Sequence, residues 1–150
     1  MKIILVTCDK NDSDLIQMKN NILNLTLLKN KFGVCRLEGD NSIPEWADSN
    51  EICSITRTAE ELSIVCPEEN IPSGIICEKD WKCLKVEGPL DFSLIGILAR
   101  ISNLLAEEKI SIFVISTYNT DYILVREADV KATIEKLSAN GYMVSDEKEN

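Results

Sequence analysis

The sequence of 150 residues contains no histidine, and its six cysteines include no CxxC pair. Zinc sites need imidazoles or closely spaced thiolates, so neither a metal site nor a cofactor is expected. The sequence also lacks a nucleophile elbow, a glycine-rich phosphate loop and a pair of carboxylates at an informative spacing. We therefore do not expect the chain to be an enzyme.

Basic residues are scarce relative to acidic ones. Lys and Arg number 16 against 25 Asp and Glu, which gives a formal net charge of −9. Binding to a phosphate backbone needs clustered basic residues, so nucleic acid is not an expected partner. No apolar run reaches the length that crosses a bilayer, so a membrane is not expected either. Met1 to Thr7 is briefly apolar but precedes no small-residue cleavage site. The prediction is a cytoplasmic protein.

The cysteines agree with a reducing compartment. An even number would permit disulfides in a secreted chain, but several lie in strand-like runs such as GVCRL and SIVCP. Free cysteine packs as a small apolar residue, and this is the interpretation that we favour. The residues concerned are Cys8, Cys35, Cys53, Cys66, Cys77 and Cys83.

The stretch from Glu87 to Glu127 has the clearest pattern, which predicts a strand end, a turn, a long helix and two further strands. Asp91 suits the N-cap of the helix, because its carboxylate can accept from the unpaired amides of the first turn. Ile110 to Ser116 and Tyr122 to Val125 alternate as strands do, around a polar turn. The apolar face of the helix is predicted to consist of Leu94, Ile97, Leu98, Ile101, Leu104 and Leu105.

Shorter patterns predict the remaining elements. Leu23 to Leu37 is typical of a hairpin that turns at Lys29-Asn30, and Ile75 to Val86 of two strands around Lys79-Asp80. The other expected elements are a helical turn at 44–47, strands at 52–56, 62–66 and 142–144, a loop at 67–74, and a helix at 128–140 ended by Gly141 in a left-handed conformation.

Two parts of the chain resemble each other. ICSITRTAEELSIVC, which begins at Ile52, aligns with IFVISTYNTDYILVR at an offset of sixty residues, with the polar turn at the same place. Upstream, FGVCRLEG aligns with WKCLKVEG at an offset of forty-nine. The two offsets differ by eleven residues, and these extra residues fall where the long helix lies in the second copy. This indicates a duplicated unit whose first copy lacks that helix. Chance similarity between short apolar strands is the alternative.

The second copy has the order β–α–β–β–α–β of a ferredoxin-like unit, an antiparallel sheet with helices on one face. We therefore predict an α+β fold of two such units, with truncated helices in the first. The predicted division is an N-terminal appendage at 1–21, a degenerate unit at 22–80, a complete unit at 81–145 and a tail at 146–150.

GPLDFS at 88–93 and ISTYNTDYILV at 115–125 occur together, and with their surroundings they resemble the ACT-domain proteins, in particular the small prokaryotic tandem-ACT group. The sequence is also similar to the ACT units of aspartokinases and of the cytosolic arginine sensors of animals. The resemblance covers Leu23 to Val144 and implies a regulatory module that binds a free amino acid between paired ACT units. The sequence offers no kinase domain, so the regulated target stays open.

An amino acid presents a carboxylate and an ammonium group close together. Amides at a helix start suit the carboxylate, whereas carboxylates or strand-end carbonyls suit the ammonium group. A structural cap at Asp91 and an ordinary polar turn at 116–121 are the alternatives. The predicted ligand-binding residues are Gly88, Asp91, Phe92, Ser93, Ser116, Thr117 and Asp121, of which Asp121 is the main acceptor for the ammonium group.

A homodimer is also expected, because the first unit has too little helix to cover its sheet, and bare sheet edges and faces tend to be paired. The alternative to a sensor is a protein-interaction or dimerisation module without a small-molecule ligand.

Overall fold

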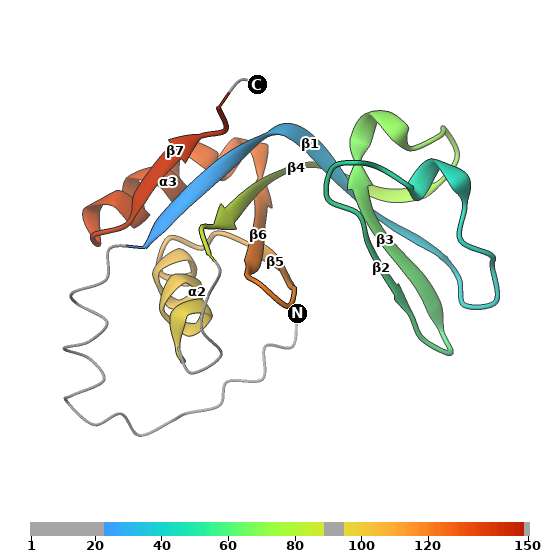
Figure 1. The fold of residues 1–150 in the computed structure, drawn as a ribbon, viewed down its shortest axis with the longest axis horizontal. Helices are drawn as coiled ribbons and strands as arrows, with labels where there is room; N and C mark the ends of the chain where they lie inside the picture. Colours follow the sequence, from blue (N-terminus) through green and yellow to red (C-terminus); the bar gives the residue numbers. More distant parts are fainter. Residues whose placement is uncertain (1–22, 89–94, 149–150) are drawn as a thin grey trace.

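The structure, a computed structural model, describes residues 23–88 and 95–148. These residues form one curled sheet of seven strands, with two helices beside one half of it (Figure 1). The strands are β1 (Asn24–Glu38), β2 (Ser54–Arg57), β3 (Glu61–Pro67), β4 (Ile76–Val86), β5 (Ile112–Ser116), β6 (Asp121–Arg126) and β7 (Met143–Asp146). The helices are α2 (Ile97–Glu107) and α3 (Val130–Ala139), and the 3₁₀ turns are η1 (Glu45–Ala47), η2 (Glu68–Asn70) and η3 (Glu127–Asp129).

The long strands β1 and β4 run through both halves of the sheet. They pair antiparallel from Leu25 opposite Val86 to Arg36 opposite Ile76. In one half, β3 pairs with β1 and β2 with β3; in the other, β6 pairs with β4 and β5 with β6. β7 lies parallel to the first residues of β1. The two halves are therefore joined by shared strands and form a single sheet.

Each half is a ferredoxin-like unit, which confirms the predicted fold class. In the second half, β4, α2, β5, β6, α3 and β7 follow one another as β–α–β–β–α–β, and the start of β1 lies between β4 and β7. In the first half the sheet order is β2-β3-β1-β4, and η1 and η2 occupy the connections that hold α2 and α3 in the second. The helices of the first unit are thus truncated, as predicted.

Two predicted turns are wrong. The chain does not reverse at Lys29-Asn30 or at Lys79-Asp80, because β1 and β4 continue through them. Each site instead lies beside one of two irregularities in the β1–β4 register. Asp80 has a φ of 60°, a left-handed conformation that a short polar side chain tolerates. Residues that are typical of turns form bulges here, since neighbouring strands hold both sides of the pairing.

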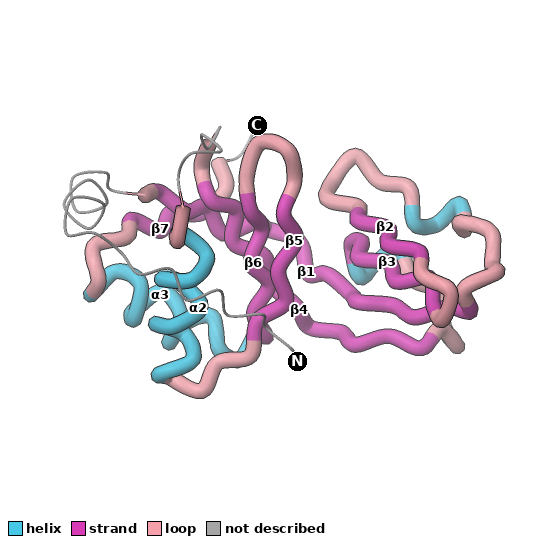
Figure 2. Tube along the Cα trace, turned by 90° about the horizontal axis from the view of Figure 1, so that it is seen from below, coloured by secondary structure: helices cyan, strands magenta, loops and turns pink. Residues whose placement is uncertain are grey.

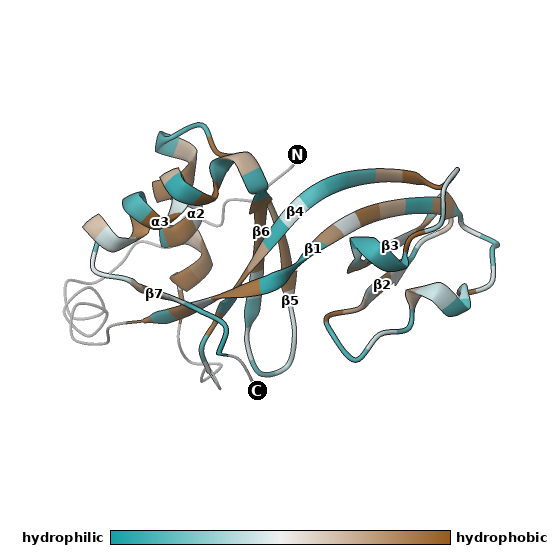
Figure 3. Cartoon of the chain, turned by 90° about the horizontal axis from the view of Figure 1, so that it is seen from above, coloured by the Kyte–Doolittle hydropathy of each residue, from teal (hydrophilic) through white to brown (hydrophobic). Residues whose placement is uncertain are grey.

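The apolar residues form three cores, and the alternation of side chains along the strands distributes them over both faces of the sheet. Leu84 and Val86 face α2 and α3, whereas Trp81 and Cys83 belong to a second core on the opposite face. A third core in the first half includes Cys35 and lies under η1 and η2. Figure 3 shows apolar residues along β1, β4 and β6, and a hydrophilic stretch in the middle of β4.

The predicted helices are present, but α2 begins later than expected. Its N-cap residue is Gly96, with a φ of 79° that glycine adopts at little cost. The predicted cap, Asp91, lies outside the described residues. On the predicted apolar face Ile97, Ile101 and Leu105 are buried, Leu98 and Leu104 are partly buried, and Leu94 lies outside the described residues.

The C-terminal helix is also shorter than predicted. Its first turn is the 3₁₀ turn η3, and α3 itself ends at Ala139. Gly141 follows with a φ of 86°, the left-handed conformation that was predicted. In neither described stretch is a helix long and apolar enough to cross a membrane.

Replacing Phe32 by Ala is expected to lower the free energy of unfolding by about 3–5 kcal/mol, the usual cost of removing a buried aromatic ring. Phe32 is 0% exposed and lies opposite Trp81 in the second core. Urea denaturation of both proteins measures the difference. The control is Ile76→Ala on the partner strand, where the side chain is 68% exposed, and its expected change is below about 0.5 kcal/mol. Equal losses in the two variants would contradict the assigned core.

Candidate functional site

The turn between β5 and β6 is attached to the end of β4. Thr120 is 5% exposed, and its Oγ1 donates a hydrogen bond of 2.5 Å to the carbonyl oxygen of Val86. Gly88 follows Val86 by two residues, so the structure brings Gly88 close to the turn where Ser116, Thr117 and Asp121 lie. The other predicted residues, Asp91, Phe92 and Ser93, lie outside the described residues.

Thr117 shapes this turn through bonds to Thr120. Its amide and its Oγ1 both donate to the Thr120 carbonyl oxygen, each over 2.9 Å. Its Oγ1 also accepts from the Thr120 amide at 3.3 Å. The hydroxyl of Thr117 is therefore engaged within the turn, which is the structural role that the polar-turn interpretation gives it.

Ser116 and Asp121 face each other as the last residue of β5 and the first of β6. The Ser116 Oγ donates to Oδ1 of Asp121 over 2.6 Å. The hydroxyl thereby orients a half-buried carboxylate. A carboxylate accepts through both oxygens, so this arrangement can receive a further donor such as an ammonium group.

The helix start predicted to bind the carboxylate is displaced. Because Gly96 occupies the N-cap of α2, the unpaired amides at the start of this helix belong to the residues after Gly96, whereas residues 91–93 lie outside the described residues. A left-handed glycine at that position fixes where the helix can begin. Sequence reasoning placed the start too early because Asp91 is a preferred cap residue, whereas a glycine cap gives a weaker signal.

A small hollow of about 220 Å³ opens between the edge strand β5 and the hairpin β2–β3. Figure 2 shows β5 and β2 as the outer strands of the two halves, which are bridged by β1 and β4. Ser116 is on its wall, so the site predicted in the second half extends toward the first. The lining residues are Ser54, Thr56, Ser63, Val65, Phe113, Val114, Ile115 and Ser116.

The hairpin β2–β3 repeats the turn geometry of β5–β6. The Thr58 amide donates to the Glu61 carbonyl oxygen over 2.8 Å, and its Oγ1 accepts from the Glu61 amide over 3.1 Å. Thr58 therefore corresponds to Thr117, an offset of fifty-nine residues and not the predicted sixty. Shifting the alignment of a strand by one residue moves every side chain to the other face. Matches between apolar residues alone did not reveal this difference of one residue.

Of the residues Thr56, Arg57 and Thr58 in the first-half hairpin, only Thr56 lines the hollow. Arg57 donates to the carbonyl oxygens of Gly39 and Asn41, the latter over 2.8 Å. The hydrogen bonds of Arg57 and Thr58 described above are therefore made to residues of the first half.

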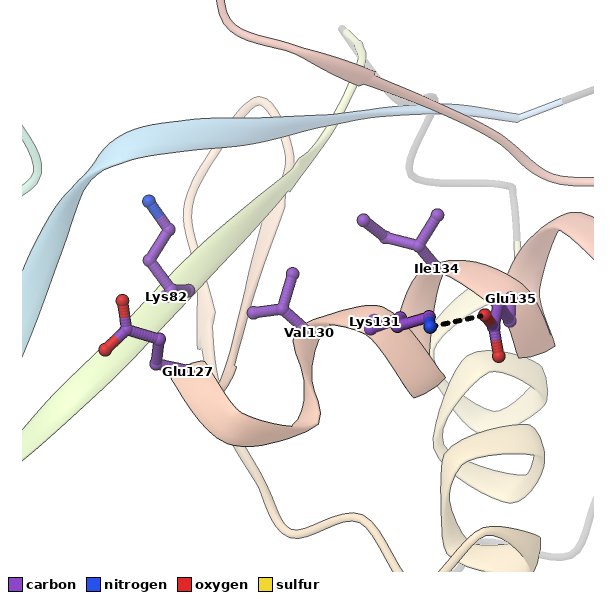
Figure 4. Close-up of a pocket in the computed structure, with 6 residues that line it drawn as sticks. All are labelled: Lys82, Glu127, Val130, Lys131, Ile134 and Glu135. Carbon is purple, nitrogen blue, oxygen red and sulfur yellow. Dashed lines mark ion pairs between the residues drawn. The ribbon is translucent and has the colours of Figure 1, made fainter.

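Sequence reasoning missed a second and larger groove, of about 560 Å³, beside α3 (Figure 4). Val130 and Ile134 give it an apolar side, and Lys82, Glu127, Lys131 and Glu135 surround them. These charges have partners. Lys82 donates to the Lys29 carbonyl oxygen over 2.6 Å, Glu127 pairs with Lys31 at 2.8 Å, and Lys131 lies 4.0 Å from Glu135. Burial lowers the pKa of Lys82.

The groove therefore has little charge to offer an amino acid, whereas the Ser116–Asp121 pair has an oriented carboxylate. The described residues also contain no group of three or more cysteine and acidic side chains that could hold a metal ion. Among the places described, the end of the β5–β6 hairpin is the best candidate site for a small zwitterion.

Two family models match the chain. A family model described as the ACT domain matches residues 76–139, and a model of an N-terminal domain matches residues 30–74. The human cytosolic arginine sensor for mTORC1 subunit 1 is 41% identical over 112 residues, which cover 65% of this chain and 34% of the sensor. The chain thus spans about a third of the length of that relative.

Solved structures share the fold over most of the chain. A protein from Agobacterium tumefaciens has a TM-score of 0.81 and 36% sequence identity, over 87% of this chain and 97% of that one. The putative C-terminal regulatory domain of aspartate kinase from Porphyromonas gingivalis has a TM-score of 0.53 and 16% identity, over 80% of this chain and 97% of that one, and this likeness concerns the fold alone. With its family model extending from β4 to α3 and its ferredoxin-like units, the chain belongs to the ACT-domain family.

Proposed function

We propose that this chain is a regulatory module that binds a free amino acid and catalyses no reaction itself. The observation that carries the proposal is the oriented carboxylate of Asp121 at a hairpin end that is attached to the end of β4. The name of one relative supports this function, since it is a cytosolic arginine sensor.

The proposed ligand site consists of Gly88, Asp91, Phe92, Ser93, Ser116, Thr117 and Asp121. Asp121 is the proposed acceptor for the ammonium group, together with strand-end carbonyls near Ser116 and Thr117. Backbone amides of residues 91–93 are the proposed donors to the carboxylate, and Gly88 would permit a close approach of the backbone. The ligand would lie at an interface between ACT units, in one chain or between two.

We also propose that the chain is divided into an appendage at 1–21, two units at 22–80 and 81–145, and a tail at 146–150. We further propose that the two units arose by duplication and that the protein acts in the cytoplasm, where its relatives named as cytosolic sensors act. The matching turns at Thr58 and Thr117 support the duplication.

Isothermal titration calorimetry with a panel of free amino acids tests the function. At least one amino acid is expected to bind and to raise the melting temperature, because a ligand that binds only the folded state stabilises it. The corresponding N-acetylated amino acid is the matched control, since it lacks the ammonium group and is expected not to bind. If no free amino acid binds the wild-type protein, the alternative of an interaction module without a small-molecule ligand replaces the sensor.

Replacing Asp121 by Ala is expected to weaken binding of the identified amino acid by roughly tenfold or more, since a hydrogen bond to a charged group contributes about 1.5–3 kcal/mol. The fold is expected to change little, because the carboxylate contacts only a hydroxyl on an exposed hairpin end. Calorimetry measures binding, and circular dichroism checks the fold. Glu60→Ala removes the same charge from the turn of the first half and serves as control. Unchanged binding by the Asp121 variant would remove this residue from the site.

The protein is expected to be a homodimer. The edge strands β2 and β5 each pair with one neighbour among the described strands, and Ile55 on β2 is 38% exposed. Such edges favour pairing with another chain. Light scattering at micromolar concentration is expected to give about twice the chain mass of 16.8 kDa, whereas a stable monomer at that concentration would contradict the prediction.

A further inference from the structure

The third core contains an unusual concentration of thiols. Cys35 and Cys66 are among its buried residues, and Cys53 and Cys77 pack against it. The five cysteines that the structure describes are all free, and Cys83 is the one that lies in a different core. The proposed amino-acid site uses none of them, so the cluster needs a separate account.

One pair in this core occupies directly opposite positions on two paired strands, the arrangement that a disulfide requires. Cys35 on β1 and Cys77 on β4 are directly opposite each other in the antiparallel register. Opposite residues in such a pair have Cα atoms about 4.5–5.5 Å apart, within the range of about 4.4–6.8 Å found in disulfides.

Cys66 is too far from both of these residues. Cys66 lies opposite Gly33, whereas Cys35 lies opposite Ile64, so Cys66 and Cys35 are diagonal neighbours at about 7–8 Å. Cys66 and Cys77 are on β3 and β4, which are separated by β1, and two strand spacings amount to about 9–10 Å. The register thus excludes a link from Cys66 to Cys35 or to Cys77, whereas Cys53, which precedes Ser54 opposite Val65, is a neighbour of Cys66.

The two thiols differ in access to solvent. Cys35 is 1% exposed, whereas Cys77 is half-buried. Burial, and then the neighbouring Cys77, raise the pKa of the Cys35 thiol, which therefore stays protonated at neutral pH. The Cys77 sulfur lies over Gly33, where a side chain would come within 2.7 Å of it. The missing side chain of Gly33 leaves this sulfur room beside β1.

We propose that Cys35 and Cys77 form a thiol–disulfide site that small disulfides oxidise through Cys77. The Cys77 thiolate attacks one sulfur of the small disulfide, a new S–S bond forms, and one small thiolate leaves. Cys35 then loses its proton and attacks the Cys77 sulfur, and the second small thiolate leaves. Two protein thiols are thus oxidised by two electrons, and one small disulfide is reduced to two thiols.

The resulting bond would join the two strands that both halves share. It closes the segment between residues 35 and 77, which contains η1, β2, β3 and η2. A link of this kind restricts the unfolded chain, so the oxidised protein is expected to melt at a higher temperature than the reduced protein.

Incubation of the full chain with glutathione disulfide tests the site, followed by alkylation of remaining thiols and peptide mapping by mass spectrometry. Trypsin leaves Cys66 and Cys77 on one peptide, because no Lys or Arg lies between Thr58 and Lys79, so Glu-C is added to cut after Glu68 or Glu69. The expected product links the peptide FGVCR to the peptide that carries Cys77. No link, a link from Cys66 to either residue, or a stable glutathione adduct on Cys77 would overturn the proposal.

Two variants separate the roles of the two thiols. Cys35→Ala is expected to stop the reaction at the glutathione adduct on Cys77, and Cys77→Ala is expected to prevent oxidation of Cys35. Cys83→Ala is the matched control in the other core and is expected to form the same link as the wild type. The mapping of the wild-type protein decides the question even if a variant does not fold.

Discussion

The pairing of β1 with β4 is the constraint on which the rest of the structure depends. Both strands extend beyond what either ferredoxin-like unit needs, and each serves both units. A straight pairing of this length would keep the same side chains on the same face throughout. On β4 the irregularity between Trp81 and Glu78 changes the face, since Trp81 and Cys83 belong to the second core whereas Cys77 packs against the third. The position of the β5–β6 turn follows, because β6 is held by β4 and the turn is held by the end of β4.

The sequence predicted the elements of the second half well, because their periodicity is long. The apolar residues of α2 recur over three turns, and those of β5 and β6 alternate on both sides of a polar turn, so each pattern has one interpretation. The first half is different. Lys29-Asn30 and Lys79-Asp80 have the composition of turns, and a local pattern cannot distinguish a turn from a bulge inside a long strand. Only the partners of β1 and β4, which are distant in sequence, decide between them.

Part of the candidate site was predictable because the strands of the β5–β6 hairpin have a clear alternating pattern. Ser116, Thr117 and Asp121 follow directly from the position of the hairpin, and the structure brings them beside the end of β4. The helix start was not predictable from the capping preference of Asp91, because the conformation of Gly96 sets where α2 begins. Nor did the sequence reveal the hollow next to Ser116, whose other wall comes from β2 and β3. That wall depends on the curl of the shared sheet, which no local pattern encodes.

The cores beneath the helices and beneath the 3₁₀ turns differ in the side chains that they contain. A helix packed on a sheet needs large side chains to fill the layer between them, as Ile101, Leu105 and Ile123 do in the second half. In the first half η1 and η2 cover the third core, which combines the large residues Leu62 and Ile64 with the small residues Cys35, Ala47 and Cys66. A side chain at Gly33 would collide with Ile71, which follows η2, and with Cys77. Large residues at Cys35 and Cys66 would likewise force η1 and η2 away from the sheet, since both are almost fully buried in the core beneath these turns. Close packing thus favours a small residue at Gly33, and the register of β1 and β4 brings Cys35 and Cys77 opposite each other.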